Sequence, residues 1–404
     1  MRAGTILDPA LEQQSEAQRR EYQRGRLRTT IAHARANSPY FRKVLPADAT
    51  ELSQVPITRK DDVPALQAAD PPFGGLVADP ALLQRIFASP GPILDPQGAG
   101  DDFWRFRMAL AAAGFARGDV AINSASYHLT PLGFMLDNAA RSLGCVVVPA
   151  GTGQTDVQVR TAHALRAAAY LGTPSFLYTL VKRGRELGLP LQIEIAFVTA
   201  EMLPESLRSE LASDFGVRVL QGYGTADLGL LAYECAEKGG MHLHPEAIVE
   251  VLDLETAAPA APGQPGQIVA TIFDPAYPLL RFATGDIGAL APPQKCPCGR
   301  TAPKLAGLMG RVGDAVKVKG MFIRGAEIEK ALKAFPVVTR FQAVITRDQH
   351  QDHLEYVIEL APGASIDAAQ VAEALRETVK VRGEVRVGQV AEGSRRIDDR
   401  RVWK

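Results

Sequence analysis

The sequence predicts an α/β protein with a large N-terminal domain and a small C-terminal domain. From Leu83 to about Val251, short apolar runs alternate with longer helical stretches, which is the pattern of a parallel sheet covered by helices. Short β-rich runs separated by Gly and Pro follow, and they indicate an antiparallel β subdomain. From Gly310 onward the runs indicate a separate α+β unit. We therefore expect two domains, residues 1–309 with layered, parallel-rich sheets and residues 310–404.

Each predicted element follows from its apolar spacing. The expected strands of the alternating region are Arg85–Ala88, Val120–Asn123, Cys145–Val148, Ala169–Leu171, Ile195–Val198 and Arg218–Leu220. The expected helices between them are Asp101–Ala113, Leu132–Leu143, Gln158–Leu165, Phe176–Leu187 and Glu205–Ser213. The β subdomain should contain Ile248–Leu252, Gly266–Phe273 and Leu279–Phe282. The C-terminal unit should contain strands Ala315–Lys319, Phe341–Thr346 and Leu354–Leu360, with helices Glu327–Ala334 and Ala368–Val379.

Composition excludes several classes of protein. The 404 residues are 46% hydrophobic and 22% charged, an ordinary globular composition. Forty-five basic residues balance forty-five acidic ones, so no net field favours nucleic acid or an anionic membrane. No apolar run is long enough to span a bilayer, and four cysteines do not make a disulfide framework. We expect a cytoplasmic globular enzyme without nucleic-acid or membrane partners.

Cysteine and histidine spacing predicts a metal site. Cys296 and Cys298 flank one proline, and Cys235 precedes them, followed by His242 and His244. Three thiolates and one imidazole form a closed tetrahedral Zn²⁺ set, which is structural rather than catalytic. We choose His242 over His244 as the fourth ligand. The alternative is free cysteines with surface histidines.

Three glycine-bearing stretches follow predicted strands. They are Gly222–Asp227, Arg281–Asp286 and Gly310–Gly320. Each alone is a weak signal, since Asp after Gly often only makes a turn. In this order, the three together are far more specific.

With these stretches, the chain resembles the adenylate-forming (acyl-CoA synthetase) superfamily and, within it, the phenylacetate-CoA ligase group. The resemblance covers nearly the whole length. It includes the Arg-rich helix with residues 37–42, Gly172–Phe176, Tyr223–Asp227, Arg281–Asp286, Cys296–Pro303 and Gly310–Gly320. The Cys-rich turn is similar to that group's zinc knuckle, here within residues 235–298.

The resemblance implies an activity with ATP, Mg²⁺ and coenzyme A. Family members join a carboxylate to ATP, forming an acyl-adenylate and pyrophosphate, and the acyl group then passes to CoA after the small C-terminal domain rotates. The partners implied are a small carboxylic acid, aromatic in the resembling group, and CoA. A homodimer is plausible for this group.

The resemblance also implies site residues. Those expected around the adenine and phosphates are Ala200, Glu201, Gln221, Gly222, Tyr223, Gly224 and Thr225. Asp227 matches the position of the family's Mg²⁺-associated carboxylate. Asp286 matches the residue that accepts hydrogen bonds from the ribose hydroxyls, and Arg311 matches a residue that contacts ribose or phosphate. Gly320 should lie on the loop that meets the pantetheine arm of CoA. Tyr127, His128 and Phe134 fall in the region that lines the acyl pocket, although each could be an ordinary core or satisfied residue.

The catalytic machinery departs from the family pattern. The phosphate loop of relatives is rich in Ser, Thr and Gly, whereas Ser89–Pro96 here contains three prolines, which lack N–H donors, and Asp95, whose charge would face the polyphosphate. Near the C-terminus, Gly393 is followed by Ser394 instead of lysine, and Arg395 or Arg396 could supply the cation. Ala226 replaces a hydroxyl residue, and Gly313 stands at the hinge position.

These departures leave three functions open. The first is an ATP-dependent aryl- or acyl-CoA ligase. The second is an acyltransferase that takes preformed acyl-CoA or acyl-adenylate and transfers the acyl group to a carrier thiol, such as an acyl-carrier protein. The third is a non-catalytic protein that binds an aryl acid or nucleotide.

Overall fold

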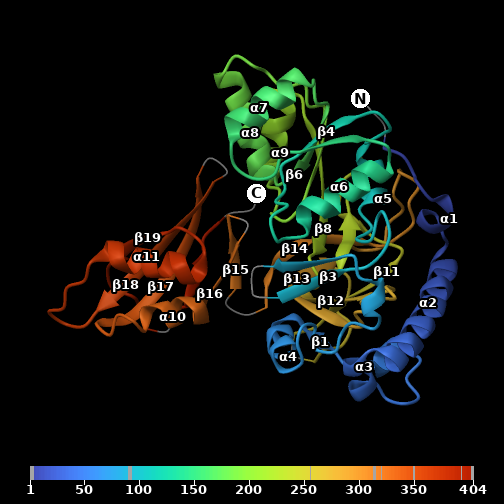
Figure 1. Cartoon of the computed structure of the whole chain (residues 1–404), viewed down its shortest axis with the longest axis horizontal. Helices are drawn as coiled ribbons and strands as arrows, with labels where there is room; N and C mark the ends of the chain where they lie inside the picture. Colours follow the sequence, from blue (N-terminus) through green and yellow to red (C-terminus); the bar gives the residue numbers. More distant parts are fainter. Residues whose placement is uncertain are drawn as a thin grey trace. The chain divides into compact units, whose positions relative to one another are not determined.

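The chain forms two compact units, residues 1–309 and residues 310–404, in a computed structural model (Figure 1). The structure describes residues 4–89, 93–254, 256–312, 315–319, 321–348, 351–392 and 394–401. The predicted hinge residue Gly313, the CoA-loop residue Gly320 and Gly393 lie outside these ranges, as do the central residues of the phosphate loop, 90–92.

One twelve-stranded sheet organises the first unit, in the order β11-β12-β13-β14-β10-β9-β8-β7-β6-β4-β5, with β1 beside β13. The strands from β8 to β5 pair in parallel. The pairs β8–β9, β9–β10, β10–β14, β13–β12 and β12–β11 are antiparallel. The bounds are β1 Thr58–Arg59, β4 Val120–Asn123, β5 Val146–Pro149, β6 Ala169–Gly172, β7 Ile195–Val198, β8 Arg218–Thr225, β9 Gly229–Tyr233, β10 Met241–Leu243, β11 Ala247–Leu252, β12 Gly266–Ile272, β13 Phe282–Leu290 and β14 Lys304–Arg311.

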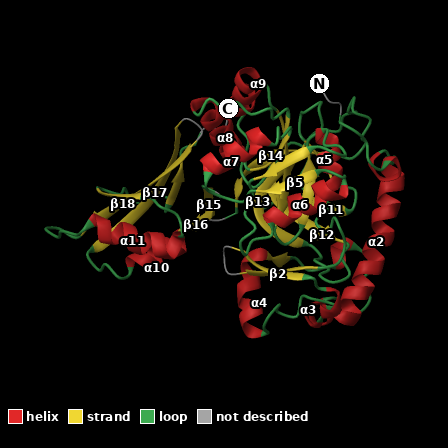
Figure 2. Ribbon diagram, turned by 45° about the horizontal axis from the view of Figure 1, so that its top comes forward, coloured by secondary structure: helices red, strands yellow, loops and turns green. Residues whose placement is uncertain are grey.

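Helices lie against this sheet and along the outside of the unit (Figure 2). They are α1 Pro9–Glu12, α2 Glu16–Asn37, α3 Pro39–Val44, α4 Val63–Ala69, α5 Arg107–Ala113, α6 Leu132–Ser142, α7 Thr155–Ala164, α8 Pro174–Glu186 and α9 Glu205–Phe215. Their ends are fixed locally. Ser15 and Gln18 form a capping box at the start of α2, and Thr173 caps α8 ahead of Pro174.

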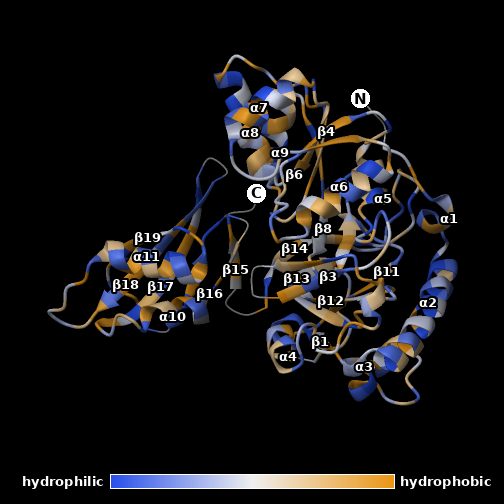
Figure 3. Ribbon diagram, in the orientation of Figure 1, coloured by the Kyte–Doolittle hydropathy of each residue, from blue (hydrophilic) through white to orange (hydrophobic). Residues whose placement is uncertain are grey.

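Hydropathy matches this arrangement. The buried strands β4 and β6 are coloured hydrophobic in Figure 3, whereas much of α2 is hydrophilic. Mean hydropathy along α2 is low because arginine and glutamate alternate on it, and Arg20 pairs with Glu16. The helix therefore presents a solvated face. Among the described residues, no helix is both long and apolar enough to cross a membrane.

Four predictions about the elements need correction. The helix expected over Asp101–Ala113 begins only at Arg107, after a turn. Arg85–Ala88 was expected within the alternating parallel region, but β2 Arg85–Ser89 pairs antiparallel with β3 Ile93–Gln97 in a separate hairpin. Leu279–Phe282 is not a strand, since β13 begins only at Phe282 after Arg281 takes a positive φ of 42°. The antiparallel strands also continue the parallel sheet through β8 instead of forming a sheet of their own.

The second unit is an α+β fold. Its four-stranded sheet has the order β19-β18-β17-β20, and a hairpin joins β15 to β16. The strands are β15 Ala315–Val318, β16 Met321–Arg324, β17 Val338–Asp348, β18 Gln351–Leu360, β19 Glu384–Val387 and β20 Ile397–Asp399. Helices α10 Gly325–Leu332 and α11 Ala368–Val379 pack with them around one apolar core that includes Ile328, Ile358 and Leu375.

Candidate active site

Strand β8 carries the motif Gln221–Thr225 at the point where the sheet changes from parallel to antiparallel pairing. Tyr223 is 5% exposed, and its hydroxyl donates a hydrogen bond of 2.9 Å to Oδ2 of Asp286 on β13. The two motif residues are 63 positions apart in sequence. The fold thus brings together an aromatic ring and the carboxylate that the resemblance places at the base and the sugar of a nucleotide.

The two glycines of this motif permit close packing. A Cβ on Gly222 would lie 2.6 Å from the ring of Phe197, and one on Gly224 would lie 2.5 Å from the Gly229 carbonyl oxygen. Both distances are shorter than real Cβ contacts allow. The carbonyl oxygen of Gly222 also accepts a hydrogen bond of 2.9 Å from the Thr199 hydroxyl, which ties β8 to the end of β7.

Gln221 makes a supporting contact. Its backbone N–H and its Nε2 donate to the carboxylate of Glu234 at 3.0 and 2.9 Å. Glu234 also accepts two hydrogen bonds from the buried guanidinium of Arg208, at 2.9 and 2.8 Å. The side chain of Gln221 is therefore held inside an ionic network.

Ala200 and Glu201 lie in the loop after β7. Ala200 has a φ of +70°, in the left-handed region that non-glycine residues rarely adopt. One carboxylate oxygen of Glu201 accepts a hydrogen bond of 3.4 Å from the backbone N–H of Ser175, at the start of α8. This contact joins two stretches that the sequence analysis singled out separately, Gly172–Phe176 and the loop after β7.

The side chain of Asp227 is completely buried, and its carboxylate forms an ion pair with the Nζ of Lys60. Lys60 lies 167 positions earlier, directly after β1, and its side chain is 17% exposed. The sequence analysis did not identify Lys60. No local signal marks it, because only the pairing of β1 with β13 carries the start of this segment into the sheet.

Asp95 forms part of the same buried group of charges. It is 2% exposed and accepts a hydrogen bond from the Ser89 hydroxyl. Burial, followed by the charge of Asp227, raises the pKa of Asp95 well above its ordinary value, against the opposing effect of Lys60. The expectation that Asp95 exposes its charge to a polyphosphate therefore needs correction, since the carboxylate is buried beside Asp227 and Lys60.

Three buried oxygen atoms in this region accept or donate no hydrogen bond within the described residues. They are Oδ1 of Asp95, Oδ1 of Asp227 and the hydroxyl of Tyr277. Burial and the charges of Asp227 and Asp95 raise the pKa of Tyr277. The two carboxyl groups beside one ammonium repel each other when charged, which contributes to the raised pKa of Asp95, and they offer oxygen ligands to a second cation. Such a donor set fits a hard divalent cation such as Mg²⁺.

The three residues expected at the acyl pocket separate into two kinds. Tyr127 and Phe134 are half-buried and in edge-to-face contact at 5.2 Å between ring centroids. The Tyr127 hydroxyl donates to Oδ2 of Asp137 at 2.9 Å and accepts from Nδ2 of Asn123 at 2.8 Å. His128 is exposed. The guanidinium of Arg85 lies 4.9 Å above the Phe134 ring, a cation–π contact that the sequence analysis did not identify.

The cationic residues predicted near the C-terminal unit lie in different settings. Arg311 ends β14 and is half-buried. Arg395 is exposed, whereas Arg396 pairs with Glu329 at 3.0 Å. Of these two arginines, Arg395 is therefore the one for which the described residues show no ion pair.

Cys235, His242, Cys296 and Cys298 converge from separate loops and strands, with all four potential ligand atoms within 4.8 Å of one another. The Sγ atoms of Cys235 and Cys296 are 3.7 Å apart, and Sγ of Cys298 is 3.4 Å from Nε2 of His242. These separations are those of a tetrahedron around Zn²⁺ with Zn–S of about 2.3 Å and Zn–N of about 2.0 Å.

The surroundings of this cluster also suit a metal. Nδ1 of His242 lies 3.2 Å from the carbonyl oxygen of Ala302, so a proton on Nδ1 would leave Nε2 free to bind metal. Burial lowers the pKa of His242 to about 4, which keeps the ring neutral near pH 7. Burial raises the pKa of the Cys235 thiol to about 12, so a cation is needed to stabilise its thiolate. His244 is not part of the cluster.

The cluster is fastened to the N-terminal segment. Arg300, two residues after Cys298, forms a buried ion pair of 2.5 Å with Glu12. Glu12 also accepts a hydrogen bond of 3.0 Å from the Tyr233 hydroxyl. Thus α1 depends on the geometry of the Cys-rich turn.

Comparisons with known proteins agree with this arrangement. The family described as AMP-binding enzyme matches residues 108–271. Phenylacetate-coenzyme A ligase of Thermus thermophilus is 29% identical over 381 residues, covering 88% of this chain and 84% of the relative. The enzyme of the same name from Escherichia coli is 26% identical over 414 residues, covering 94% and 92%.

A solved structure has the same fold. The crystal structure of 2-hydroxyisobutyryl-CoA ligase in complex with 2-HIB-AMP and CoA aligns with a TM-score of 0.87 at 23% identity. The alignment covers 97% of this chain and 92% of that one. At this identity the likeness establishes the architecture.

Proposed function

The chain belongs to the adenylate-forming superfamily, and we propose from this membership that it is an acid–CoA ligase of the phenylacetate-CoA ligase group. In the proposed reaction, a carboxylate attacks the α-phosphate of ATP, releasing pyrophosphate and forming an acyl-adenylate. The thiol of CoA then attacks the acyl carbon and releases AMP. The observation that carries this proposal is the hydrogen bond between Tyr223 and Asp286.

The adenosine would lie against β8. We propose that Tyr223 supplies the aromatic surface for the base and that Asp286 accepts hydrogen bonds from the ribose hydroxyls. Ala200 and Glu201, in the loop after β7, would lie along the edge of the base. Because Tyr223 already donates to Asp286, the carboxylate is held in place before the nucleotide arrives. This fixed position reduces the reorganisation that binding requires.

The phosphates would lie near Asp227. Lys60 is the ammonium in contact with that carboxylate, and we propose that it contributes the positive charge that the altered C-terminal segment does not supply through a lysine. Asp227 and Asp95 would hold Mg²⁺ through their unpartnered oxygens. When bound, the metal would neutralise phosphate charge. Arg311 is the further cation that the resemblance places at ribose or phosphate, and Arg395 would supply a cation in place of the C-terminal lysine of relatives.

The zinc site would have a structural role and no catalytic one. Four protein ligands leave no open coordination position, so we propose a structural Zn²⁺ at Cys235, His242, Cys296 and Cys298. Because those thiols must remain reduced, we also propose a cytoplasmic location.

The thioester step rests on the resemblance. We propose that Gly320 meets the pantetheine arm and that the C-terminal unit rotates at Gly313, both outside the described residues. An aromatic acid is proposed because relatives named phenylacetate-coenzyme A ligase cover most of the chain. Phe134 and Tyr127 would contact its ring, and His128 would lie at the mouth of the acyl site. A homodimer is a further prediction, to be checked by light scattering.

The test is ATP–pyrophosphate exchange with purified protein and phenylacetate or benzoate, followed by a CoA thioester assay. We expect exchange that requires both the acid and Mg²⁺, and that Asp286→Ala abolishes. Arg160→Gln, a change on an exposed residue of α7, should leave exchange intact. No exchange with any aromatic acid, despite measurable AMP binding, would contradict ligase activity.

A second function is favoured by one observation. The only hydroxyl of the phosphate-loop sequence, Ser89, donates to Asp95 and is therefore engaged within the protein. A loop that holds triphosphate weakly suits an acyltransferase that accepts preformed acyl-CoA or acyl-adenylate and uses an acyl-carrier protein. Mass spectrometry of acyl transfer to a carrier thiol without ATP distinguishes the two, and ligand binding without any turnover would indicate a non-catalytic protein.

A further inference from the structure

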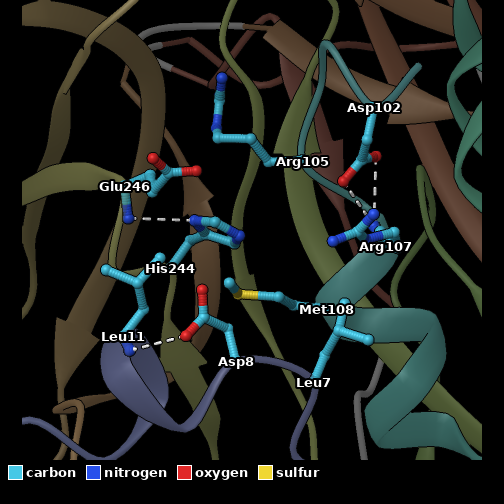
Figure 4. Close-up of a pocket in the computed structure, with 9 residues that line it drawn as sticks. All are labelled: Leu7, Asp8, Leu11, Asp102, Arg105, Arg107, Met108, His244 and Glu246. Atoms are coloured by element: carbon cyan, nitrogen blue, oxygen red, sulfur yellow. Dashed lines mark hydrogen bonds between the residues drawn. The ribbon is translucent and has the colours of Figure 1, made fainter. Parts of the chain in front are cut away.

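A cavity lies in the first unit, lined by none of the residues assigned to the candidate active site or the metal cluster. Its volume is about 260 Å³, far more than the roughly 10–15 Å³ that one water requires and just below the roughly 300 Å³ at which ligand pockets begin. Figure 4 shows its nine lining residues, which are Leu7, Asp8, Leu11, Asp102, Arg105, Arg107, Met108, His244 and Glu246. They come from the start of α1 and the residues before it, from the first turn of α5 and the segment before it, and from the turn between β10 and β11.

His244 contributes a buried donor without an acceptor. His244 is 1% exposed. Its Nδ1 accepts a hydrogen bond of 3.2 Å from the backbone N–H of Glu246. A nitrogen that accepts from an amide cannot carry a proton, so the neutral ring carries its proton on Nε2. Nε2 has no partner in the described residues, and in Figure 4 this side of the ring points toward the middle of the pocket.

An unpaired buried donor destabilises a folded protein, because it has lost its hydrogen bonds to water without replacing them. It is therefore a marker for an acceptor that the protein itself does not provide. A carboxylate oxygen is the acceptor that a neighbouring cation would favour. Arg107 lines the opposite side of the cavity and is exposed, and no carboxylate forms an ion pair with it in the part of the chain that the structure describes.

The same pocket also contains negative charge without a cation in contact. Asp102 accepts two hydrogen bonds from the backbone N–H of Arg107, at 3.2 and 3.1 Å, and Asp8 accepts one from that of Leu11 at 3.2 Å. Neither carboxylate forms an ion pair among the residues described. Burial raises the pKa of Asp102 to about 6, which reflects the incomplete compensation of its charge.

Of the remaining charged residues of the pocket, Glu246 has an ion pair and Arg105 has none among the described residues. Glu246 accepts from the Tyr22 hydroxyl at 3.1 Å and pairs with Arg26 at 3.3 Å. The guanidinium of Arg105 donates to the carbonyl oxygens of Phe103 and Leu228, but its Nε has no partner in the described residues. The groups left for a ligand are thus the His244 donor, the guanidinium groups of Arg105 and Arg107, and the carboxylates of Asp8 and Asp102.

We propose that this cavity binds a small zwitterion of the α-amino-acid class. Its carboxylate accepts from Nε2 of His244 and from Arg107, its ammonium donates to Asp8 and Asp102, and its side chain contacts Leu7, Leu11 and Met108. A plain carboxylate would leave Asp8 and Asp102 without an ammonium in contact, and a plain amine would leave the His244 donor unpaired. Only a molecule with both charges satisfies all four polar groups.

The test is calorimetric titration of the full-length protein, without ATP or CoA, with valine, isovalerate and isobutylamine. These probes share one apolar body and carry both charges, only the carboxylate, or only the ammonium. We expect valine to bind at least about tenfold more tightly than either other probe, since each hydrogen-bonded charge contributes about 1.5–3 kcal/mol. Binding of this kind is independent of whether the protein is a ligase.

Variants place the binding at this cavity. Asp8→Asn retains the oxygen that caps α1 while removing the charge, and Arg107→Gln removes the exposed guanidinium. Each should weaken valine binding by about tenfold or more, whereas Arg160→Gln on α7 should not change it. Thermal unfolding of each variant verifies that it is folded. Equal affinity for valine and isovalerate, unchanged affinity in Asp8→Asn, or no binding of valine would each overturn the proposal.

Discussion

The Tyr223 hydroxyl lies 2.9 Å from Oδ2 of Asp286, and this contact joins strands β8 and β13, which are not neighbours in the sheet. The phenol fixes one oxygen of the carboxylate and leaves the aromatic ring against the strand. A structural contact and a nucleotide contact therefore depend on the same pair of side chains.

Tyr223→Phe tests this pairing. The ring remains, but Asp286 loses a hydrogen bond that positions it, so AMP affinity should fall by about tenfold with little loss of stability. Asp286→Asn removes the charge that accepts the ribose hydroxyls and should lower adenylation by about 10²–10³. Fluorescence titration with AMP and ATP–pyrophosphate exchange measure the two effects. A Tyr223→Phe protein with unchanged AMP affinity would mean that the hydroxyl has no positioning role.

Lys60 should be essential to the stability of the first unit. Lys60→Met leaves Asp227 buried without its cation, which should cost about 3–5 kcal/mol in the free energy of unfolding. The double variant Lys60→Met with Asp227→Asn removes both charges and should recover most of that loss. Urea denaturation of both single variants and the double variant measures the coupling energy. Additive single effects would show that the ion pair does not stabilise the fold.

Metal content should depend on the Cys-rich turn. We expect one Zn²⁺ per chain by mass spectrometry of metals, and Cys298→Ser should lose it because a hydroxyl is a poor ligand for zinc. Cys145→Ala is the matched control, since Cys145 packs in an apolar core and is not part of the cluster. Chelation should lower the unfolding temperature of the first unit by several degrees. A stoichiometric zinc content in Cys298→Ser would exclude this ligand set.

Asp102 should give the protein a pH-dependent stability. Its folded pKa of about 6 exceeds the ordinary 3.8, so the folded state binds a proton more tightly than the unfolded state. The wild type should therefore gain up to about 3 kcal/mol relative to Asp102→Asn as the pH falls from about 7 to about 4. Asparagine keeps an acceptor for the Arg107 N–H. Denaturation of both proteins across this range measures the difference, and parallel curves would contradict the raised pKa.

Local patterns predicted the regular elements well. Val120–Asn123, Ile195–Val198 and Ala368–Val379 have the same bounds in the structure as in the sequence analysis, because apolar spacing and turn residues define them locally. The strand predicted over Leu279–Phe282 is absent for a physical reason. Leu279 and Leu280 are buried in the core, but burial alone does not make a strand, and the left-handed turn at Arg281 separates them from β13.

The candidate site was predicted only where a motif marks it. Tyr223 and Asp286 belong to recognisable stretches, so their roles could be proposed before their contact was known. Lys60 carries no such mark, and Asp95 was singled out only as a charge of the phosphate loop. Their burial with Asp227 arises from long-range pairing that brings three charged side chains into one space. Likewise, no spacing in the sequence predicts that His244 lines a cavity instead of the metal cluster.

The ion pair between Glu12 and Arg300 also constrains the order in which the chain can fold. The partners are 288 positions apart, so during synthesis at about 5–20 residues per second α1 waits about 15–60 s for its anchor. Throughout that interval the acidic side chain remains hydrated, and the strands between β4 and β12 emerge first. Attachment of α1 to the Cys-rich turn therefore cannot precede the synthesis of Arg300.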